Sequence, residues 1–278
     1  MTSTVTSADG TSIAFDSTGS GPALILVNGA MSFRAWSPTL QSLQAGLADG
    51  NTVFNYDRRG RGENALIETP EPDAATAKQA ELDDLAALIA QAGGSAILMG
   101  FSSGSVLSLE AALAGLPVAG LILFEPPFVI TADRPYVGAD YRERVLAALT
   151  EGRRDDALTA FLVEASNVPP EFVGGMQESS AWAGMQQVAP TLTYDAAIMG
   201  PTQTGDPSLL KKFAAVDVPT LTIASQGSDP WLQAGAAATA ELVPNATHQV
   251  LPGEVHDLDI EPALPVLKAW LGQLTAGR

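Results

Sequence analysis

Short apolar runs alternate with longer helical patterns along most of the chain, and this alternation restricts the fold more than any other feature of the sequence. Because strands that are apolar throughout are buried on both faces, the pattern predicts a mainly parallel sheet with helices on both sides, an α/β fold. The chain has 278 residues, 46% of them hydrophobic, which is enough to fill such a core. The apolar runs lie at residues 23–29, 52–57, 96–102 and 119–127, and the same strand rhythm resumes with runs at 219–227 and 248–253.

The beginning and the middle of the chain depart from this rhythm. Alternating polarity around Asp9-Gly10 predicts an antiparallel hairpin at the edge of the sheet. Residues 128–206 carry helical patterns and turn residues without a buried strand, so we expect a helical cap inserted into the α/β core. The expected division is 1–127 and 207–278 for the core and 128–206 for the cap.

The charge balance narrows the possible partners. The chain has 31 Asp and Glu against 14 Lys and Arg, a formal net charge of −17, and no basic run, so it would repel a nucleic-acid backbone. It has no cysteine, which excludes disulfides and thiolate chemistry and is compatible with a reducing compartment. It shows neither a secretory signal pattern nor an apolar run long enough to cross a membrane. We expect a cytoplasmic protein with a small-molecule partner, and neither nucleic acid nor membrane as a partner.

The stretch GFSSG at 100–104 has the pattern G-x-S-x-G between an apolar run and a helical pattern. That context is typical of a sharp strand-to-helix turn that presents its central serine, Ser102, as a nucleophile. The glycines leave room for the turn, and the start of the helix directs backbone N–H groups toward developing negative charge. The alternative is a Gly/Ser-rich turn without chemistry, and the flanking elements favour the nucleophile.

A serine nucleophile needs a base, and the chain has two histidines. His256 follows the last apolar run, in the loop before the final helical pattern. The carboxyl ends of parallel strands form the ligand-binding edge of a sheet, so this position suits a base. His248 opens the same run and is expected at the opposite end of the sheet. We therefore predict His256 as the base and a structural role for His248.

Three carboxylates are candidates for the residue that orients the base. Asp229 lies just beyond the apolar run that follows the cap, and it gives the chain order Ser102, Asp229, His256. Asp217 precedes that run, at the wrong end. Glu125 follows the strand before the cap and is the serious competitor. We predict Asp229, with Glu125 as the alternative.

With these residues identified, essentially the whole chain resembles the α/β-hydrolase family, in particular its cap-bearing serine esterase-like members. The stretches LVNGA, YDRRGRGEN, GFSSG, GSDP and LPGEVH are similar to family motifs and occur in the family's order. Each motif is weak alone, and the five together make the resemblance specific. It implies a mainly parallel eight-stranded sheet with helices on both faces and a helical cap between the sixth and seventh strands.

The resemblance also implies an oxyanion hole formed by the backbone N–H groups of Ala30 and Ser103. Many family members have His-Gly where this chain has Asn28-Gly29, and an asparagine can still hydrogen-bond the loop. Structural roles are expected for three residues of the D-x-R-G-x-G stretch, Asp57, Arg58 and Arg61.

The expected activity is hydrolysis of an ester, lactone or thioester carbonyl through an acyl-enzyme on Ser102, with no metal or organic cofactor required. A serine at this position argues against the haloalkane dehalogenases and epoxide hydrolases of this fold, because they use aspartate there. The alternatives are a cofactor-free haloperoxidase or perhydrolase, a C–C bond hydrolase with the same triad, or a non-catalytic ligand-binding member of the fold.

The substrate pocket is expected to be apolar. Candidate lining residues are Met31 and Phe101 from the core loops and Phe128, Trp182 and Met185 from the cap. If these side chains face the pocket, they form a wall suited to a neutral, hydrophobic acyl group or lactone ring. The alternative is that they pack the cap onto the core.

Overall fold

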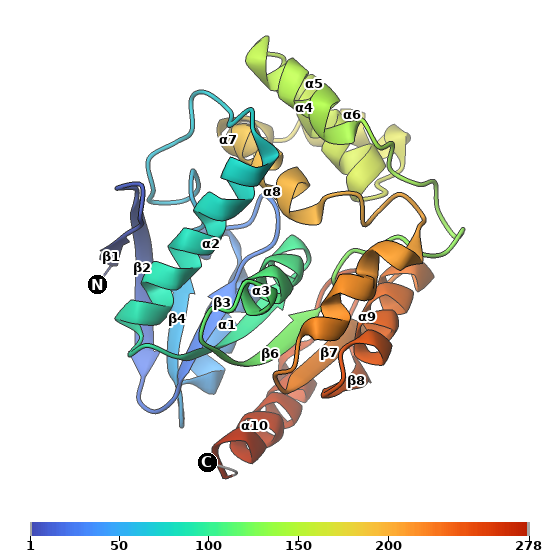
Figure 1. Ribbon diagram of the computed structural model, residues 1–278. Helices are drawn as coiled ribbons and strands as arrows, with labels where there is room; N and C mark the ends of the chain where they lie inside the picture. The colour runs from blue at the N-terminus through green and yellow to red at the C-terminus, as the bar shows by residue number, and fades with distance from the viewer. Residues whose placement is uncertain (1, 277–278) are drawn as a thin grey trace.

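An eight-stranded sheet crosses the molecule in a computed structural model that describes residues 2–276 (Figure 1). Its strand order is β1-β2-β4-β3-β5-β6-β7-β8. β1 and β2 form the expected hairpin, β2 pairs antiparallel with β4, and the remaining pairs are parallel. The strands are β1 (Ser3–Thr6), β2 (Ser12–Gly19), β3 (Ala23–Val27), β4 (Thr52–Tyr56), β5 (Ala96–Phe101), β6 (Val118–Phe124), β7 (Thr220–Ser225) and β8 (Ala246–Leu251). The predicted α/β fold is confirmed.

Helices cover both faces of this sheet, as the continuously apolar strands predict. In β3, Ile25 and Val27 pack on the face toward α2 and α3, whereas Leu24 and Leu26 pack on the face toward α1 and α10. All four side chains are fully buried, and each such burial is worth about 1.5–3 kcal/mol. The helices of the core are α1 (Pro38–Leu47), α2 (Ala74–Gln91), α3 (Ser103–Leu113), α9 (Pro230–Leu242) and α10 (Ile260–Ala276), with one short 3-10 helix, η1 (Arg34–Trp36).

The segment between β6 and β7 contains helices and no strand, and Figure 1 shows most of it lying above the carboxyl ends of the parallel strands. Its first four helices pack around a hydrophobic cluster of their own, whereas α8 also packs against α2 and α3. The exact limits expected for the cap, 128 and 206, stay a prediction. The elements are α4 (Tyr141–Thr150), α5 (Arg154–Ala160), η2 (Phe161–Ala165), α6 (Pro170–Gln177), α7 (Trp182–Val188), η3 (Ala189–Thr191), α8 (Leu192–Met199) and η4 (Pro207–Ala215).

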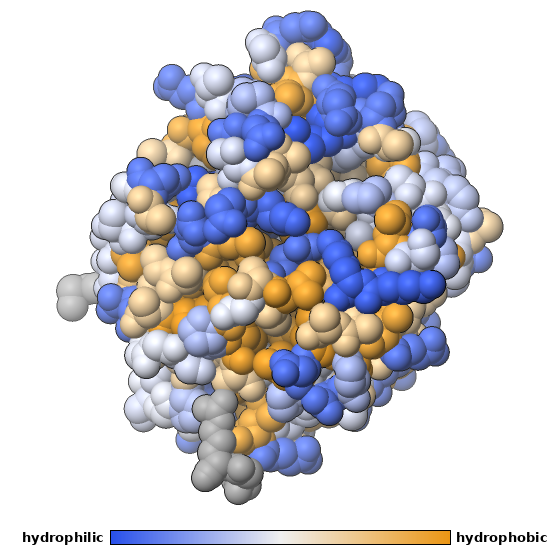
Figure 2. All heavy atoms as spheres, in the orientation of Figure 1, coloured by the Kyte–Doolittle hydropathy of each residue, from blue (hydrophilic) through white to orange (hydrophobic). Residues whose placement is uncertain are grey.

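The polarity of the surface differs between the cap and the core on the face that Figure 2 shows. In Figure 2 hydrophilic side chains gather over the top of the molecule, where Figure 1 places α4 and α5, and hydrophobic side chains are more frequent below them. No helix within residues 2–276 combines the length and the apolar character needed to cross a bilayer.

Candidate active site

Ser102 lies on the sharp turn between β5 and α3, as its motif predicts. Its backbone has φ 54° and ψ −124°, a strained conformation for a residue with a side chain. The turn is tight because a Cβ on Gly100 would lie 2.5 Å from the carbonyl oxygen of Gly104, and a Cβ on Gly104 would lie 2.2 Å from that of Val27. Both glycines of G-x-S-x-G are therefore required by the close approach of the backbone.

The loop after β3 touches this turn directly. A Cβ on Gly29 would lie 3.0 Å from the Cβ of Ser102, so the chain needs glycine there. Asn28 fastens the loop, because its amide nitrogen donates to the carbonyl of Tyr56 at 2.9 Å and its side-chain oxygen accepts from Ser32 at 3.2 Å. The asparagine thus performs the loop-holding task expected of it, and Ala30 follows at the wall of the cavity beside Ser102.

His256 lies in the loop after β8 and lines the same cavity as Ser102. Its backbone N–H donates to the hydroxyl of Ser228 at 2.8 Å, and its ring stacks on Phe124 with a centroid separation of 5.9 Å. Its Nδ1 lies 2.6 Å from Oε2 of Glu125. With Nδ1 bonded to a carboxylate, Nε2 is the ring nitrogen left to face a reacting group.

Glu125 therefore holds the position that the sequence assigned to Asp229. Its carboxylate is fully buried, and its second oxygen accepts from the backbone N–H of Ser225 at 2.7 Å. Asp229 is the N-cap residue before α9, and its carboxylate accepts instead from the indole of Trp231 at 3.2 Å. The prediction that Asp229 orients His256 is corrected to Glu125, because the carboxylate of Glu125 is the one that contacts Nδ1 of His256.

The sequence does contain a signal for this arrangement. Glu125 is a single charge at the end of the apolar strand VAGLILF, directly before Pro126. A carboxylate at such a buried position requires a partner, and a histidine or an arginine is the expected one. Asp229, in contrast, stands before a proline at a helix start, where aspartate is common for local reasons.

His248 lies inside β8, since that strand begins two residues earlier than expected. Its Nδ1 is 2.8 Å from the hydroxyl of Thr222 on β7. Burial lowers the pKa of the His248 imidazole below its ordinary value of 6.5, against the opposing effect of Thr222. The residue is part of the sheet's packing.

A cavity of about 550 Å³ lies between the cap and the carboxyl ends of the strands. Its wall includes Ser102, His256, Ala30 and Ser103. The apolar part of the wall comes from both layers, and its members include Phe101, Phe124, Phe161, Leu192, Met199 and Trp231.

Among the side chains predicted to line the pocket, Phe101 does so. The other four lie elsewhere, three of them buried and Met185 partly buried, which corrects the prediction. Phe128 stacks on Phe213 at 5.7 Å between centroids. Met31, from the loop after β3, packs with Trp182 and Met185 of the cap in one hydrophobic cluster, where the indole of Trp182 donates to Asp155 at 2.8 Å. A helical cap needs hydrophobic packing of its own, and the sequence does not distinguish those residues from the residues of a pocket wall. The sequence analysis also did not identify Phe161 and Leu192, which line the cavity.

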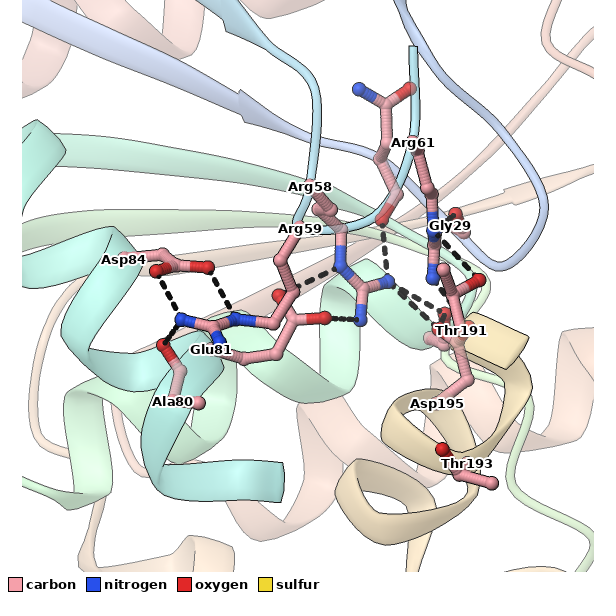
Figure 3. Close-up of polar contacts among 12 residues, drawn as sticks. Gly29, Arg58, Arg59, Arg61, Ala80, Glu81, Asp84, Thr191, Thr193 and Asp195 are labelled. Atoms are coloured by element: carbon pink, nitrogen blue, oxygen red, sulfur yellow. Dashed lines mark hydrogen bonds and ion pairs between the residues drawn. The ribbon is translucent and has the colours of Figure 1, made fainter. Parts of the chain in front are cut away.

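A buried polar network lies behind the cavity, and its main members are drawn in Figure 3. Arg58 pairs with Glu81 of α2 at 2.7 Å and with Asp195 of α8 at 2.8 Å. Arg61 pairs with the second oxygen of Asp195 at 2.5 Å. Neither arginine is exposed, so the structural role expected for both is consistent with their positions. Asp57 accepts from the backbone N–H of Arg34 at 2.8 Å in the same loop.

Comparison with known proteins adds to this geometry. Residues 24–260 match the model of the alpha/beta hydrolase family. An alpha/beta hydrolase from Sphaerobacter thermophilus is 42% identical, with a TM-score of 0.83 over 97% of this chain and 100% of that chain. The esterase RhEst1 from Rhodococcus sp. is 26% identical, with a TM-score of 0.65 over 98% and 99% of the two chains.

A thermophilic esterase from Thermogutta terrifontis is 23% identical, with a TM-score of 0.66 over 99% of both chains, and this likeness concerns the fold alone. The comparison with curated proteins gives no significant match. The family match spans the strand pattern, the turn at Ser102 and the loop of His256, and the chain therefore belongs to the α/β hydrolase family.

Proposed function

We propose that this hydrolase cleaves an ester, lactone or thioester-type carbonyl substrate through an acyl-enzyme on Ser102. The observation that carries the proposal is the 2.6 Å contact between Nδ1 of His256 and buried Glu125, at a cavity whose wall also includes Ser102. A carboxylate on Nδ1 fixes the tautomer in which Nε2 can accept a proton. Glu125 replaces Asp229 as the third member of the proposed triad.

In the proposed reaction, the Ser102 oxygen adds to the substrate carbonyl while Nε2 of His256 takes the hydroxyl proton. The backbone N–H groups of Ala30 and Ser103 receive the negative charge on the carbonyl oxygen. The proton then passes from His256 to the leaving alkoxide or thiolate. A water molecule, deprotonated by His256, cleaves the acyl-enzyme and restores Ser102.

The cavity favours a neutral, hydrophobic substrate. Its volume of about 550 Å³ suits a small molecule, and aromatic and aliphatic side chains dominate its wall. Arg142 also lines the cavity, but both terminal nitrogens of its guanidinium donate to the backbone carbonyls of Glu71 and Pro72. Acidic side chains at the wall, among them Glu143 and Asp257, disfavour an anionic substrate. The esterase RhEst1, at 26% identity, agrees with an ester as substrate.

The test combines active-site labelling with a substrate panel. A fluorophosphonate probe should label the protein once, and peptide mass spectrometry should place the label on Ser102. Aryl esters, thioesters and lactones of graded acyl length then identify the substrate class. A protein that is neither labelled nor active on any of them would be a binding member of the fold, and faster peracid formation than ester hydrolysis would favour a perhydrolase.

A further inference from the structure

Asp195 of α8 has no role in the proposed triad, yet it lies 4% exposed at the wall of the cavity. One of its oxygens accepts from Arg58 and from the hydroxyl of Ser103, each at 2.8 Å, and the other accepts from Arg61 at 2.5 Å. Because the protein itself occupies both oxygens, Asp195 is poorly placed to bind a substrate. Burial would raise its pKa, but the two arginines outweigh this and lower it, so the carboxylate is charged.

The two arginines hold the loop that supplies a proposed oxyanion donor. Arg61 donates from one nitrogen to Asp195 and from another to the carbonyl oxygen of Gly29 at 2.6 Å (Figure 3). Arg58 donates to the carbonyl oxygen of Asn28 at 3.2 Å. Two successive carbonyl groups of the loop thus face the arginines that Asp195 holds.

The planarity of the peptide bond converts this contact into a direction for the next N–H. In a trans peptide the C=O and the following N–H point to opposite sides. The carbonyl of Gly29 points toward Arg61, so the N–H of Ala30 must point away from Arg61. A guanidinium on the carbonyl also polarises the peptide and makes its N–H a stronger donor.

The second proposed donor is linked to the same carboxylate. Ser103 is the first residue of α3, and its hydroxyl donates to Asp195 while its backbone N–H belongs to the turn that carries Ser102. Asp195 is therefore linked to both candidate oxyanion donors. Arg61 connects it to the peptide between Gly29 and Ala30, and the Ser103 hydroxyl connects it to Ser103 itself.

We propose that Asp195 is a positioning residue that aligns the oxyanion hole of the hydrolase from the cap side. This inference rests on the proposed function, since it assigns Ala30 and Ser103 as donors. It also gives α8 a task in the reaction beyond covering the cavity, because the carboxylate that orders the two core segments comes from the inserted segment.

The test compares Asp195→Asn with a matched control, Asp84→Asn. Asp84 also forms a buried ion pair with an arginine of the same loop, at 2.6 Å from Arg59. The hydrogen bonds of Arg59 go to Asp9, Ala80 and Asp84, and its guanidinium lies over the Tyr194 ring, so it makes no hydrogen bond to either oxyanion segment. Both variants lose a buried carboxylate, and Asp195→Asn alone disturbs the oxyanion segments. Equal effects of the two substitutions on activity would overturn the proposal.

The expected result is a loss of about 10- to 100-fold in kcat for Asp195→Asn, smaller than the loss from deleting an oxyanion donor outright. KM for a neutral aryl ester should change by less than about threefold, because the contact matters in the transition state. The inhibition constant of a trifluoromethyl ketone, whose adduct carries an oxyanion, should rise by the same factor as kcat/KM falls. A loss confined to KM would overturn the proposal.

Amide hydrogen exchange separates this inference from the proposed function, because it needs no activity. Exchange at residues 28–31 and 102–104 should accelerate in Asp195→Asn and not in Asp84→Asn. If the wild-type protein neither hydrolyses esters nor reacts with fluorophosphonate, the proposed function fails, and unchanged exchange in Asp195→Asn would separately refute the ordering role of Asp195.

A milder variant decides the matter if Asp195→Asn does not fold. Ser103→Ala keeps the backbone N–H and removes only the hydroxyl that donates to Asp195. We expect kcat to fall by about 3- to 10-fold with KM unchanged, since the variant loses one hydrogen bond to the charged carboxylate and keeps the backbone N–H. Wild-type kcat in that variant would refute the link between Asp195 and the turn that carries Ser102.

Discussion

Glu125→Gln is the substitution that most directly tests the proposed triad. The wild-type carboxylate accepts from Nδ1 of His256 at 2.6 Å with one oxygen and from the N–H of Ser225 at 2.7 Å with the other. A glutamine has the same shape but only one oxygen. If that oxygen stays with Ser225, the NH2 group faces Nδ1, and the imidazole must adopt the opposite tautomer, with its proton on Nε2.

The magnitude follows from that geometry. With a proton on Nε2, His256 cannot accept the proton of Ser102, and the equivalent carboxylate-to-amide change in another serine triad lowers kcat by about 10⁴. We expect a loss of about 10³- to 10⁴-fold here, equivalent to about 4–5.5 kcal/mol of transition-state stabilisation. The alternative rotamer, with the amide oxygen on His256, leaves the buried N–H of Ser225 facing an NH2 group and destabilises the fold by about 1–3 kcal/mol.

Asp229→Asn is the matched control, because it changes the carboxylate that the sequence favoured. That carboxylate accepts one bond of 3.2 Å from Trp231, so we expect less than a tenfold change in kcat, or less than about 1.4 kcal/mol. Stopped-flow measurement of the acylation burst on an aryl ester, together with thermal unfolding, separates chemistry from stability. A larger kcat loss from Asp229→Asn than from Glu125→Gln would refute the assignment of Glu125.

Four further predictions concern the triad, the sheet and the pocket. Ser102→Ala should abolish fluorophosphonate labelling and lower kcat by about 10⁴- to 10⁶-fold without loss of fold, as circular dichroism would verify. His256→Ala should remove the acylation burst, whereas His248→Ala should leave burst and turnover within about threefold; equal losses would contradict the placement of β8. Because burial depresses the pKa of His248 in the folded state, its contribution to stability is present above pH 6.5 and is lost as pH falls through its lowered folded value. Thermal unfolding temperatures of His248→Gln should therefore decline less than those of the wild type on acidification below pH 6.5, and parallel decline would contradict this. For esters of graded acyl length, kcat/KM should rise with each added methylene, by an amount equivalent to up to about 0.8 kcal/mol of transition-state stabilisation, until the cavity is full. Leu192→Ala or Phe161→Ala should move the optimum to longer chains. An unchanged optimum in both variants would exclude these residues from the acyl pocket.

The sheet could be predicted because the composition of each strand reflects how deeply the strand is buried. A strand buried on both faces is mostly apolar, and β3 and β5 show this at every position without reference to the rest of the chain. The predicted ends of the strands were less accurate than the predicted strands themselves. The run at 119–127 ends as a strand at Phe124, because Pro126 and Pro127 have no N–H to donate to a ladder.

The candidate site could be predicted only where its geometry is local. The turn at Ser102 needs nothing beyond neighbouring glycines, and His256 was one of two histidines, separated by which end of one strand it follows. The choice between Asp229 and Glu125 depends on which side chain reaches His256, and that is set by backbone angles and neighbours distant in sequence. The pocket wall has the same difficulty, because Trp182 and Leu192 are equally apolar and only packing decides which one faces the cavity.

Strained backbone conformations are concentrated around the proposed active site. Among the described residues, positive φ occurs at five non-glycine positions, of which Met31, Ser102, Glu125 and His256 lie in the loops that surround the cavity. These loops follow four different strands, β3, β5, β6 and β8, at the same edge of the sheet. Each such conformation costs about 1–3 kcal/mol and persists only where the surrounding structure determines it. The buried sheet behind these loops provides that rigidity, and the side chains it holds in place are the nucleophile, the base and the carboxylate of the proposed triad.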